Sequence, residues 1–306
     1  MAEPEILIVG AGPAGLTAGI YSARAGHTTL ILEKELVGGQ MNKTATVENY
    51  PGFAQPVNTL ELVQNMDAQA RRFGCQIETG EATGLKLNGN QIELETSIGV
   101  IRTRTLIICA GTEPRKLGLE NETELTGRGI SYCAICDGPL YRDREVAVVG
   151  GGDSALEEAD YLTRFCSRVH LIHRRDQFRA ARIVEERVRS NPKIVLHLSR
   201  VVSRIHGTRQ LEGLTLTDLK TGTSIELPVA GLFIYVGLIP GTGWCRSVVP
   251  LDEAGFILTD EKMQTAVPGI FAAGDIRKKS VRQIATAVGD GAIAAQSAHE
   301  FLTLSR

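Results

Sequence analysis

Short unbroken apolar runs alternate with helical patterns along the chain. Residues 6–9 form the first apolar run, residues 16–25 follow with apolar positions at helical spacing, and residues 28–32 predict a second strand. An unbroken run of this length is typical of a strand that is buried on both faces of a parallel sheet. The order strand, helix, strand therefore predicts an α/β fold with a parallel sheet.

The rest of the first half continues this pattern. Residues 59–73 predict a helix, and a turn at Asn88-Gly89-Asn90 joins two short predicted strands at 85–87 and 92–94. Another apolar run at 106–110 predicts a buried strand that ends at a glycine. The first module ends there.

The same order of elements then begins again, which indicates an internal duplication. The second module predicts strands at 145–149 and 169–172, helices at 155–165 and 180–190, several short strands, and a last apolar run at 231–237. Residues 269–273 and 282–302 then predict one more strand and a long helix. Because the second sheet is already complete, we expect this strand to return to the first module.

Two domains follow from this return, with one inserted in the other. Residues 1–113 and 243–306 form the predicted discontinuous domain, and residues 114–242 form the inserted one. A length of 306 residues suits two domains that each bury a core.

Composition and charge narrow the class of protein. The chain is 43% hydrophobic and 22% charged, with a net charge of −2, so no basic surplus indicates nucleic acid as a partner. We find no leader pattern and no apolar run long enough to span a bilayer. Six cysteines without a framework spacing indicate a reducing compartment, and we expect a cytoplasmic protein.

A glycine-rich turn lies between the first predicted strand and its helix. Gly10 permits a tight turn, Gly12 lets the backbone approach a pyrophosphate, and Gly15 allows close packing of the helix. The helix N-terminus supplies amide groups and a positive dipole. Glu33 ends the second strand, where a carboxylate would accept hydrogen bonds from ribose hydroxyls. These features predict a dinucleotide site, and the alternative is a glycine-rich turn in another α/β protein.

The second module repeats the turn as Gly150, Gly152 and Ala155, but its second strand ends in a basic segment. His173-Arg174-Arg175 and then Arg179 stand where the first module supplies a carboxylate. A guanidinium cluster favours a 2′-phosphate through charge-assisted bonds. The second turn therefore predicts NADPH rather than NADH, and the alternative is a solvated basic turn.

Cys133 and Cys136 are the only two cysteines close together in the sequence, and Asp137 follows them directly. Outside a metal pattern, this spacing in an intracellular protein is typical of redox chemistry. A carboxyl group within hydrogen-bonding reach could move protons as the disulfide opens and closes. The alternatives are a zinc half-site or two buried thiols. Zinc usually needs a second pair, and the other four cysteines are scattered singly.

Two nucleotide sites of different preference and one dithiol indicate a relay of electrons. Nicotinamide donates two electrons as hydride, and a flavin can accept them and pass them to a disulfide, so a flavin is the expected middle step. The dithiol and the NADPH turn share one module, so both can reach one flavin only in turn. We therefore expect the modules to rotate about the two crossovers, and a rigid crosslink between them should stop turnover.

The chain resembles the low-molecular-weight thioredoxin reductases, which are FAD- and NADPH-dependent pyridine nucleotide-disulfide oxidoreductases. The resemblance covers essentially the whole length and implies two Rossmann-like, three-layer, glutathione-reductase-like α/β domains. It also implies reduction of thioredoxin by NADPH through FAD and the Cys133/Cys136 disulfide. The matching segments are residues 10–15, 38–40, 133–137, 150–155, 173–180, 274–275 and 282–283.

The same resemblance implies roles for individual residues. Cys136 resembles the flavin-proximal cysteine, Cys133 resembles the interchange thiol that attacks the partner's disulfide, and Asp137 resembles the acid and base. The residues implied for FAD are Gly10, Gly12, Pro13, Ala14, Gly15, Glu33, Gly39, Gln40, Asn49, Gly274, Asp275, Arg282, Gln283 and Ile284. The residues implied for NADPH are Gly150, Gly152, Asp153, Ser154, Ala155, His173, Arg174, Arg175 and Arg179.

The expected partners are thioredoxin or a thioredoxin-like protein and a second copy of the chain, without nucleic acid or membrane. Two departures from the family pattern bear on the acceptor: Pro139-Leu140 replaces paired aromatics, and residues 277–283 are basic where an acidic and aromatic version is common. A glutaredoxin-like or peroxiredoxin-type acceptor, or ferredoxin as donor, is the alternative within enzymes, although Arg174 and Arg175 argue against ferredoxin. From another class, the chain could be a nucleotide-sensing protein whose cysteines report redox state without turnover.

Overall fold

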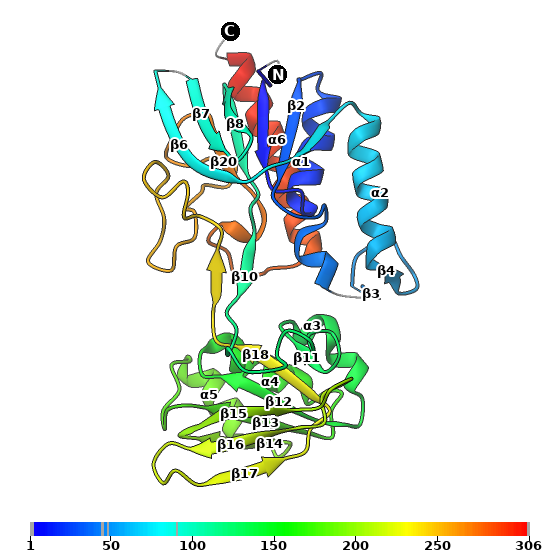
Figure 1. Cartoon of the computed structure of the whole chain (residues 1–306), viewed down its shortest axis with the longest axis vertical. Helices are drawn as coiled ribbons and strands as arrows, with labels where there is room; N and C mark the ends of the chain where they lie inside the picture. The colour runs from blue at the N-terminus through cyan, green and yellow to red at the C-terminus, as the bar shows by residue number, and fades with distance from the viewer. Residues whose placement is uncertain (1–2, 44–45, 48, 90, 305–306) are drawn as a thin grey trace. The chain divides into compact units, whose positions relative to one another are not determined.

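The structure is a computed structural model that describes residues 3–43, 46–47, 49–89 and 91–304 (Figure 1). The chain divides into two compact units, Met1–Glu113 with Ile239–Arg306, and Pro114–Leu238. Strands β10 (Thr112–Pro114) and β19 (Leu238–Pro240) carry the chain from one unit to the other.

The first unit is built on a five-stranded parallel sheet in the order β20-β9-β1-β2-β5. In β1, Ile6 lies opposite Thr29 of β2 and Thr105 of β9. The C-terminal strand β20 pairs in parallel with β9, which confirms the predicted return of the chain to the first sheet. The strands are β1 (Ile6–Val9), β2 (Thr29–Glu33), β5 (Gln76–Thr79), β9 (Thr105–Ile108) and β20 (Ile270–Ala272).

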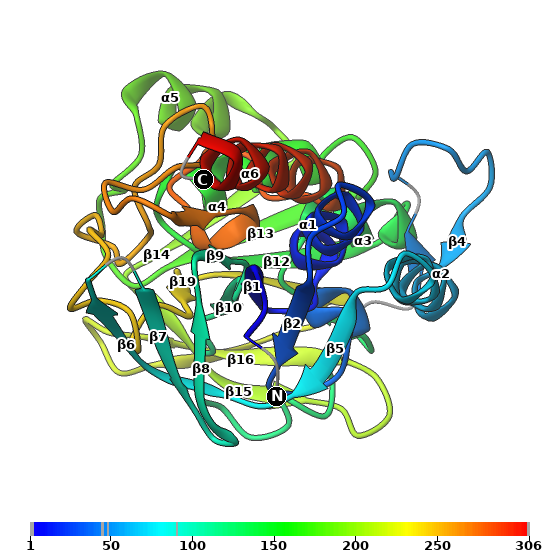
Figure 2. The same cartoon turned by 90° about the horizontal axis from the view of Figure 1, so that it is seen from above.

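Both faces of this sheet are covered, as the continuous apolar runs predict. Ile6 and Ile8 pack into a cluster with the helices, whereas Leu7 and Val9 pack toward a three-stranded antiparallel sheet. Helices α1 and α6 lie side by side, although they are far apart in sequence (Figure 2). The covering elements are α1 (Pro13–Arg24), α2 (Thr59–Arg72), α6 (Ile284–Leu304), β6 (Ala82–Asn88), β7 (Gln91–Thr96) and β8 (Gly99–Thr103).

The second unit repeats this plan. Its parallel sheet has the order β11-β18-β12-β13-β14, so β12 takes the place of β1 and β11 that of β20. Helices cover one face and an antiparallel sheet covers the other, which confirms the duplication. The elements are β11 (Ile130–Ser131), β12 (Glu145–Gly150), α4 (Asp153–Leu162), β13 (Arg168–His173), α5 (Arg182–Ser190), β14 (Ile194–Leu198), β15 (Arg200–His206), β16 (Gly213–Asp218), β17 (Ser224–Leu227) and β18 (Gly231–Tyr235).

Element boundaries differ from the predictions by a few residues, for local reasons. Helix α1 begins at Pro13 rather than residue 16, because proline at the first helical position needs no amide partner. The predicted turn between β6 and β7 is present, with Asn88 opposite Gln91, although Asn90 lies outside the described residues. The short elements are β3 (Thr46–Val47), β4 (Val57–Asn58), α3 (Ala134–Asp137), and the 3-10 helices Gly39–Lys43, Gly138–Tyr141 and Gly274–Ile276. Within the described part of the chain, no helix is long and apolar enough to cross a membrane.

Candidate active site

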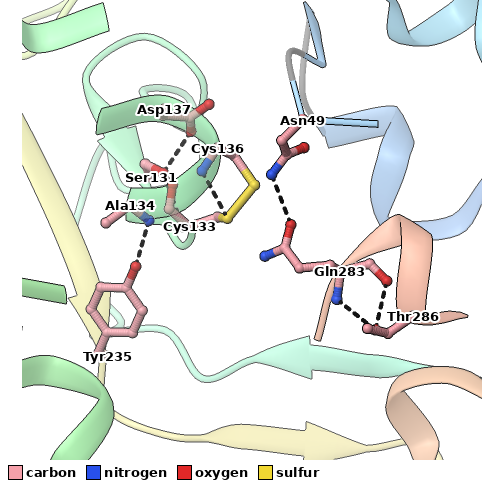
Figure 3. Close-up of a disulfide and its surroundings, with 9 residues drawn as sticks. All are labelled: Asn49, Ser131, Cys133, Ala134, Cys136, Asp137, Tyr235, Gln283 and Thr286. Carbon is pink, nitrogen blue, oxygen red and sulfur yellow. Dashed lines mark hydrogen bonds between the residues drawn. A yellow bond between two sulfur atoms is a disulfide. The ribbon is translucent and has the colours of Figure 1, made fainter. Parts of the chain in front are cut away.

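The two close cysteines lie just beyond the carboxyl end of β11 and form a disulfide, with their Cα atoms 5.3 Å apart. Cys133 is the N-cap residue of helix α3, and its Sγ accepts a hydrogen bond from the Cys136 N–H at 3.2 Å (Figure 3). Both residues are partly exposed. The predicted disulfide is confirmed. After reduction, the same N–H can stabilise a thiolate at Cys133, since hydrogen bonding to a charged form favours it.

The remaining cysteines are unsuited to this chemistry. Cys75, Cys109, Cys166 and Cys245 are buried free thiols. Burial raises the pKa of Cys75 and Cys245 to about 12 and that of Cys166 to about 11, so little reactive thiolate forms near neutral pH. Across the residues that the structure describes, no group of three or more His, Cys, Asp and Glu side chains could hold a metal ion.

Asp137 lies next to the disulfide in sequence and is held by Ser131. The Ser131 hydroxyl donates to Asp137 Oδ2 at 2.6 Å, and Ser131 Oγ accepts from the Cys133 N–H at 3.0 Å (Figure 3). Burial raises the pKa of Asp137 above its ordinary value, and the bond from Ser131 opposes part of that rise. A carboxyl group with a raised pKa is better matched to proton transfer near neutral pH.

Replacing Asp137 with asparagine should therefore separate activity from stability. We expect disulfide reduction to fall by about 10²–10⁴-fold, the range typical of a lost acid or base. Because the folded-state pKa exceeds the unfolded value, this carboxyl group costs stability progressively as pH rises from the unfolded pKa through the folded pKa. The asparagine variant should then melt at the same or a higher temperature at pH 7, measured by thermal unfolding beside steady-state rates.

Ser131→Ala is the companion variant. Loss of the hydroxyl donor should raise the pKa of Asp137 further and move the corresponding midpoint of the pH–rate profile to higher pH. That midpoint should be absent in Asp137→Asn. An unchanged pH profile in both variants would exclude Asp137 as the proton-transfer group.

Tyr235 supports the dithiol helix and was not singled out from the sequence. It lies at the carboxyl end of β18, and its hydroxyl oxygen accepts a hydrogen bond from the Ala134 N–H at 2.5 Å (Figure 3). The backbone amide directly after Cys133 is thus paired. Tyr235 and Ala134 are 101 residues apart, so no local sequence pattern could have predicted this hydrogen bond.

The second glycine turn lies at the same edge of the sheet as the dithiol, since parallel strands β11 and β12 both end there. Residues of this turn hold the basic segment in place. Gly151 O accepts from the Arg179 N–H, and Asp153 Oδ1 accepts from the Ala181 N–H, each at 2.7 Å. A Cβ atom built on Gly152 would meet nothing within 4 Å, which leaves its backbone open to a ligand.

The three predicted arginines line a cavity of about 370 Å³. Its lining residues are Arg174, Arg175, Asp176, Gln177, Phe178, Arg179, Ser199, Leu219 and Lys220. The last three were missed by sequence reasoning, because they follow β14 and β16 rather than the glycine turn. A cavity bounded by three guanidinium groups suits a phosphate monoester.

His173 is positioned differently from the arginines. It is buried, its ring stacks on Phe178, and its Nε2 lies 3.1 Å from the Gln177 carbonyl oxygen. Burial lowers the pKa of His173, which favours the neutral form of the ring. Its ring fills the space that a side chain at Gly151 would need. His173 therefore shapes the turn and is not among the residues that line the cavity.

The first glycine turn has the geometry that the sequence predicts. Gly10 has φ +105°, and a Cβ on Gly10 or Gly15 would collide with the main chain. A Cβ on Gly12 would meet nothing within 4 Å, so the backbone is open there. Glu33 is buried, and its Oε2 accepts from the Ala11 N–H at 2.6 Å. Glu33 thus fixes the turn and, because carboxylate oxygens have further lone pairs, can still accept a ribose hydroxyl.

Other predicted flavin residues make contacts between segments that are distant in sequence. The Gly38 N–H donates to the Ala11 carbonyl at 2.9 Å, which brings the segment with Gly39 and Gln40 against the turn. The Asn49 side-chain amide donates to Gln283 Oε1 at 3.0 Å, at the start of α6 (Figure 3). Residues distant in sequence are therefore brought together, Gly38 with Ala11 and Asn49 with Gln283.

Asp275 and Arg282 carry buried polar atoms that need a partner. Asp275 Oδ1 and Arg282 Nε are buried without a hydrogen bond among the described residues, although Lys279 Nζ lies 3.9 Å from Asp275 Oδ1. Burial also raises the pKa of Asp275, which follows β20 at the carboxyl edge of the sheet. A buried polar atom without a hydrogen bond is costly, so both atoms fit a polar ligand bound across the strand ends. These observations fit a flavin dinucleotide.

Two cations of the basic segment near Asp275, Arg277 and Lys279, point inward, although the sequence allowed the segment to be a surface for a partner protein. Arg277 Nη1 lies 3.1 Å from Asp290 Oδ1, and Lys279 Nζ lies 2.9 Å from Asp290 Oδ2. The Arg277 and Lys279 side chains are only 15% and 9% exposed. Asp290 also accepts from the Gly274 N–H at 3.1 Å. The two cations therefore hold the Gly274 turn rather than face a partner protein.

A redox disulfide and two dinucleotide turns, on duplicated three-layer units, define a flavoprotein oxidoreductase that uses a nicotinamide cofactor. A family profile described as pyridine nucleotide-disulphide oxidoreductase matches residues 4–291. Thioredoxin reductases of Listeria innocua and Bacillus subtilis are each 44% identical to this chain over 300 residues, which cover 97% of this chain and 93% and 94% of theirs. The chain belongs to this family and, within it, to the thioredoxin reductases.

A solved structure agrees with this assignment. The crystal structure of thioredoxin reductase from Streptococcus pyogenes is 41% identical and matches with a TM-score of 0.92, covering 98% of each chain. The resemblance seen in the sequence and the predicted fold class are therefore confirmed.

Proposed function

We propose that this thioredoxin reductase uses NADPH and FAD to reduce the disulfide of thioredoxin or a thioredoxin-like protein. The observation that carries the proposal is the Cys133–Cys136 disulfide at the same sheet edge as a cavity lined by Arg174, Arg175 and Arg179. The high identity to proteins named thioredoxin reductase supports thioredoxin as the acceptor. By the same similarity, we propose a homodimer.

FAD would be held in the first unit by the Gly10 turn, Glu33, Asp275 and the start of α6. The open backbone at Gly12 suits the pyrophosphate, and Glu33 suits a ribose. Asp275 Oδ1 and Arg282 Nε would gain hydrogen-bond partners. Bound FAD would accept the two electrons of a hydride and deliver them to a disulfide.

The protein's own thiols would then carry out disulfide exchange. Two electrons and two protons open the Cys133–Cys136 bond to a dithiol, with Asp137 placed to move one proton. The Cys133 thiolate attacks the acceptor's disulfide, so that a mixed disulfide forms and one acceptor thiol leaves. The Cys136 thiolate attacks Cys133 Sγ, which releases the second acceptor thiol and restores the starting disulfide. The net reaction consumes one NADPH and one proton for each acceptor disulfide reduced.

Four buried free cysteines suit a reducing compartment, and we propose the cytoplasm as the location.

Anaerobic titration of the purified protein with NADPH tests this function. We expect a yellow protein that releases FAD on denaturation and whose flavin absorbance bleaches with NADPH. Adding oxidised thioredoxin should restore the colour, and oxidised glutaredoxin serves as the competing acceptor. A colourless protein, or bleaching that no disulfide acceptor reverses, would contradict the proposal.

A further inference from the structure

One side of the arginine-lined cavity in the second unit is formed by residues outside the glycine turn and the arginine segment. This side is the turn between β16 and β17, which contributes Leu219 and Lys220 to the cavity lining. Ser199, just after β14, forms the link between this turn and the arginine segment.

Main-chain hydrogen bonds fix this turn to the arginine segment. The Ser199 N–H donates to the Arg175 carbonyl at 3.0 Å, and the Leu219 N–H donates to the Ser199 carbonyl at 2.8 Å. Ser199 therefore bridges the arginine segment and the β16–β17 turn through its main chain. It is buried and has φ +54°. The turn therefore keeps its position relative to Arg175.

Asp218 sets the conformation of the turn itself. Its Oδ1 accepts from the Lys220 N–H at 2.8 Å and from the Thr221 N–H at 3.2 Å. These two backbone donors hold the pKa of Asp218 below its ordinary value, so the carboxylate stays charged. Arg200 Nε lies 3.5 Å from the other oxygen. The backbone of Lys220 is thus anchored, while its side chain is 65% exposed.

Lys220 also forms an ion pair with Asp176, the negatively charged residue of the cavity lining. Asp176 is the only carboxylate among the described residues of the lining, and it would repel a phosphate. Lys220 Nζ lies 3.3 Å from Asp176 Oδ2. A lysine so placed can neutralise Asp176 in the free protein and turn its ammonium group toward a phosphate that enters beside it.

We propose that Lys220 is a specificity-determining residue for the 2′-phosphate of the nicotinamide cofactor. This inference rests on the proposed use of NADPH. Lys220 acts with the three arginines as a fourth cation and offsets the repulsion from Asp176. It lies 44 residues beyond Asp176 in the sequence, in the turn between β16 and β17.

Calorimetric titration of the FAD-loaded protein with 2′,5′-ADP and with 5′-AMP tests the proposal. Loss of one charge-assisted contact at an exposed site should weaken 2′,5′-ADP binding by about 5- to 20-fold in Lys220→Ala. Binding of 5′-AMP should change by less than about 2-fold, because it lacks the 2′-phosphate. Lys220→Arg should restore most of the affinity. Adding Asp176→Asn to Lys220→Ala should recover part of it, since the repelling charge is gone.

Lys116→Ala is the matched control. Lys116 is an exposed lysine of the same unit outside the cavity, so its loss removes the same charge from the chain. We expect 2′,5′-ADP binding to stay within about 2-fold of wild type. If Lys220→Ala binds 2′,5′-ADP as wild type does while Arg175→Ala does not, Lys220 has no such role. If the wild-type protein itself fails to prefer 2′,5′-ADP to 5′-AMP, the NADPH assignment falls, and this proposal falls with it.

Discussion

Replacing Cys136 with serine is expected to lower NADPH-dependent reduction of thioredoxin by more than about 10³-fold, because a thiolate essential to exchange is lost. The flavin should still bleach on addition of NADPH, since the nucleotide turns are untouched. Cys133→Ser should have an equally large effect, because the pair acts as one unit and neither cysteine alone can form the internal disulfide. Stopped-flow flavin absorbance and thioredoxin-coupled NADPH oxidation measure the two half-reactions separately.

Cys166→Ala is the control for these variants. Cys166 is a buried free thiol of the same unit, and burial raises its pKa to about 11. Its replacement should leave acceptor reduction within about 2-fold of wild type, although the small cavity should cost some stability. Full thioredoxin reduction by Cys136→Ser would overturn the exchange mechanism.

The two serine variants also test which cysteine is the interchange thiol that attacks the acceptor's disulfide. A single-cysteine thioredoxin, activated as a mixed disulfide with thiopyridine, offers one sulfur to attack. If Cys133 is the interchange thiol, Cys136→Ser should release thiopyridone and form a stable covalent complex, visible on a non-reducing gel. Cys133→Ser should react much more slowly. The opposite order would exchange the roles of the two cysteines.

The double replacement Arg174→Ala with Arg175→Ala is expected to remove most of the preference for NADPH. Charge-assisted hydrogen bonds contribute about 1.5–3 kcal/mol each, and two of them correspond to about 10²–10⁴-fold. We expect the lower end, about 10²-fold in kcat/KM for NADPH, because both side chains are exposed to solvent. The same ratio for NADH should change by less than about 3-fold, since that cofactor has no 2′-phosphate.

Arg209→Ala controls for the loss of positive charge. Arg209 is exposed on the same unit and does not line the cavity. We expect both cofactors to react with this variant at close to wild-type rates. If the double arginine variant kept its preference for NADPH, the phosphate would have to bind elsewhere, and the assignment of this cavity would be wrong.

Much of the fold follows from local sequence patterns. The run at residues 6–9 is apolar at every position, and in the structure both faces of β1 are buried. Gly10, Gly12 and Gly15 predict a turn whose steric reasons are visible in the structure, because a side chain at Gly10 or Gly15 would meet main-chain atoms. These predictions succeed because a buried strand and a tight turn each impose their requirement on a few consecutive residues.

Predictions of individual side-chain roles are less complete. Glu33 is predicted to bind a ribose hydroxyl, and the structure shows that it also accepts a hydrogen bond from the Ala11 N–H. The basic segment after Gly274 could have been a partner surface, yet Asp290 of α6 draws Arg277 and Lys279 inward. The position of Asp290 relative to that segment depends on how α6 packs against the rest of the unit. Helix packing cannot be predicted from a local sequence pattern.

The sequence alone determined the duplicated strand–helix–strand plan, the two glycine turns, the arginine segment and the dithiol, because each is encoded by neighbouring residues. Only the tertiary structure decided which distant residues complete them: Tyr235 at the Ala134 amide and Lys220 beside Asp176. The physical reason is that parallel strands from separate parts of the chain end at one sheet edge. Contacts there are set by sheet order and packing, which sequence spacing does not contain.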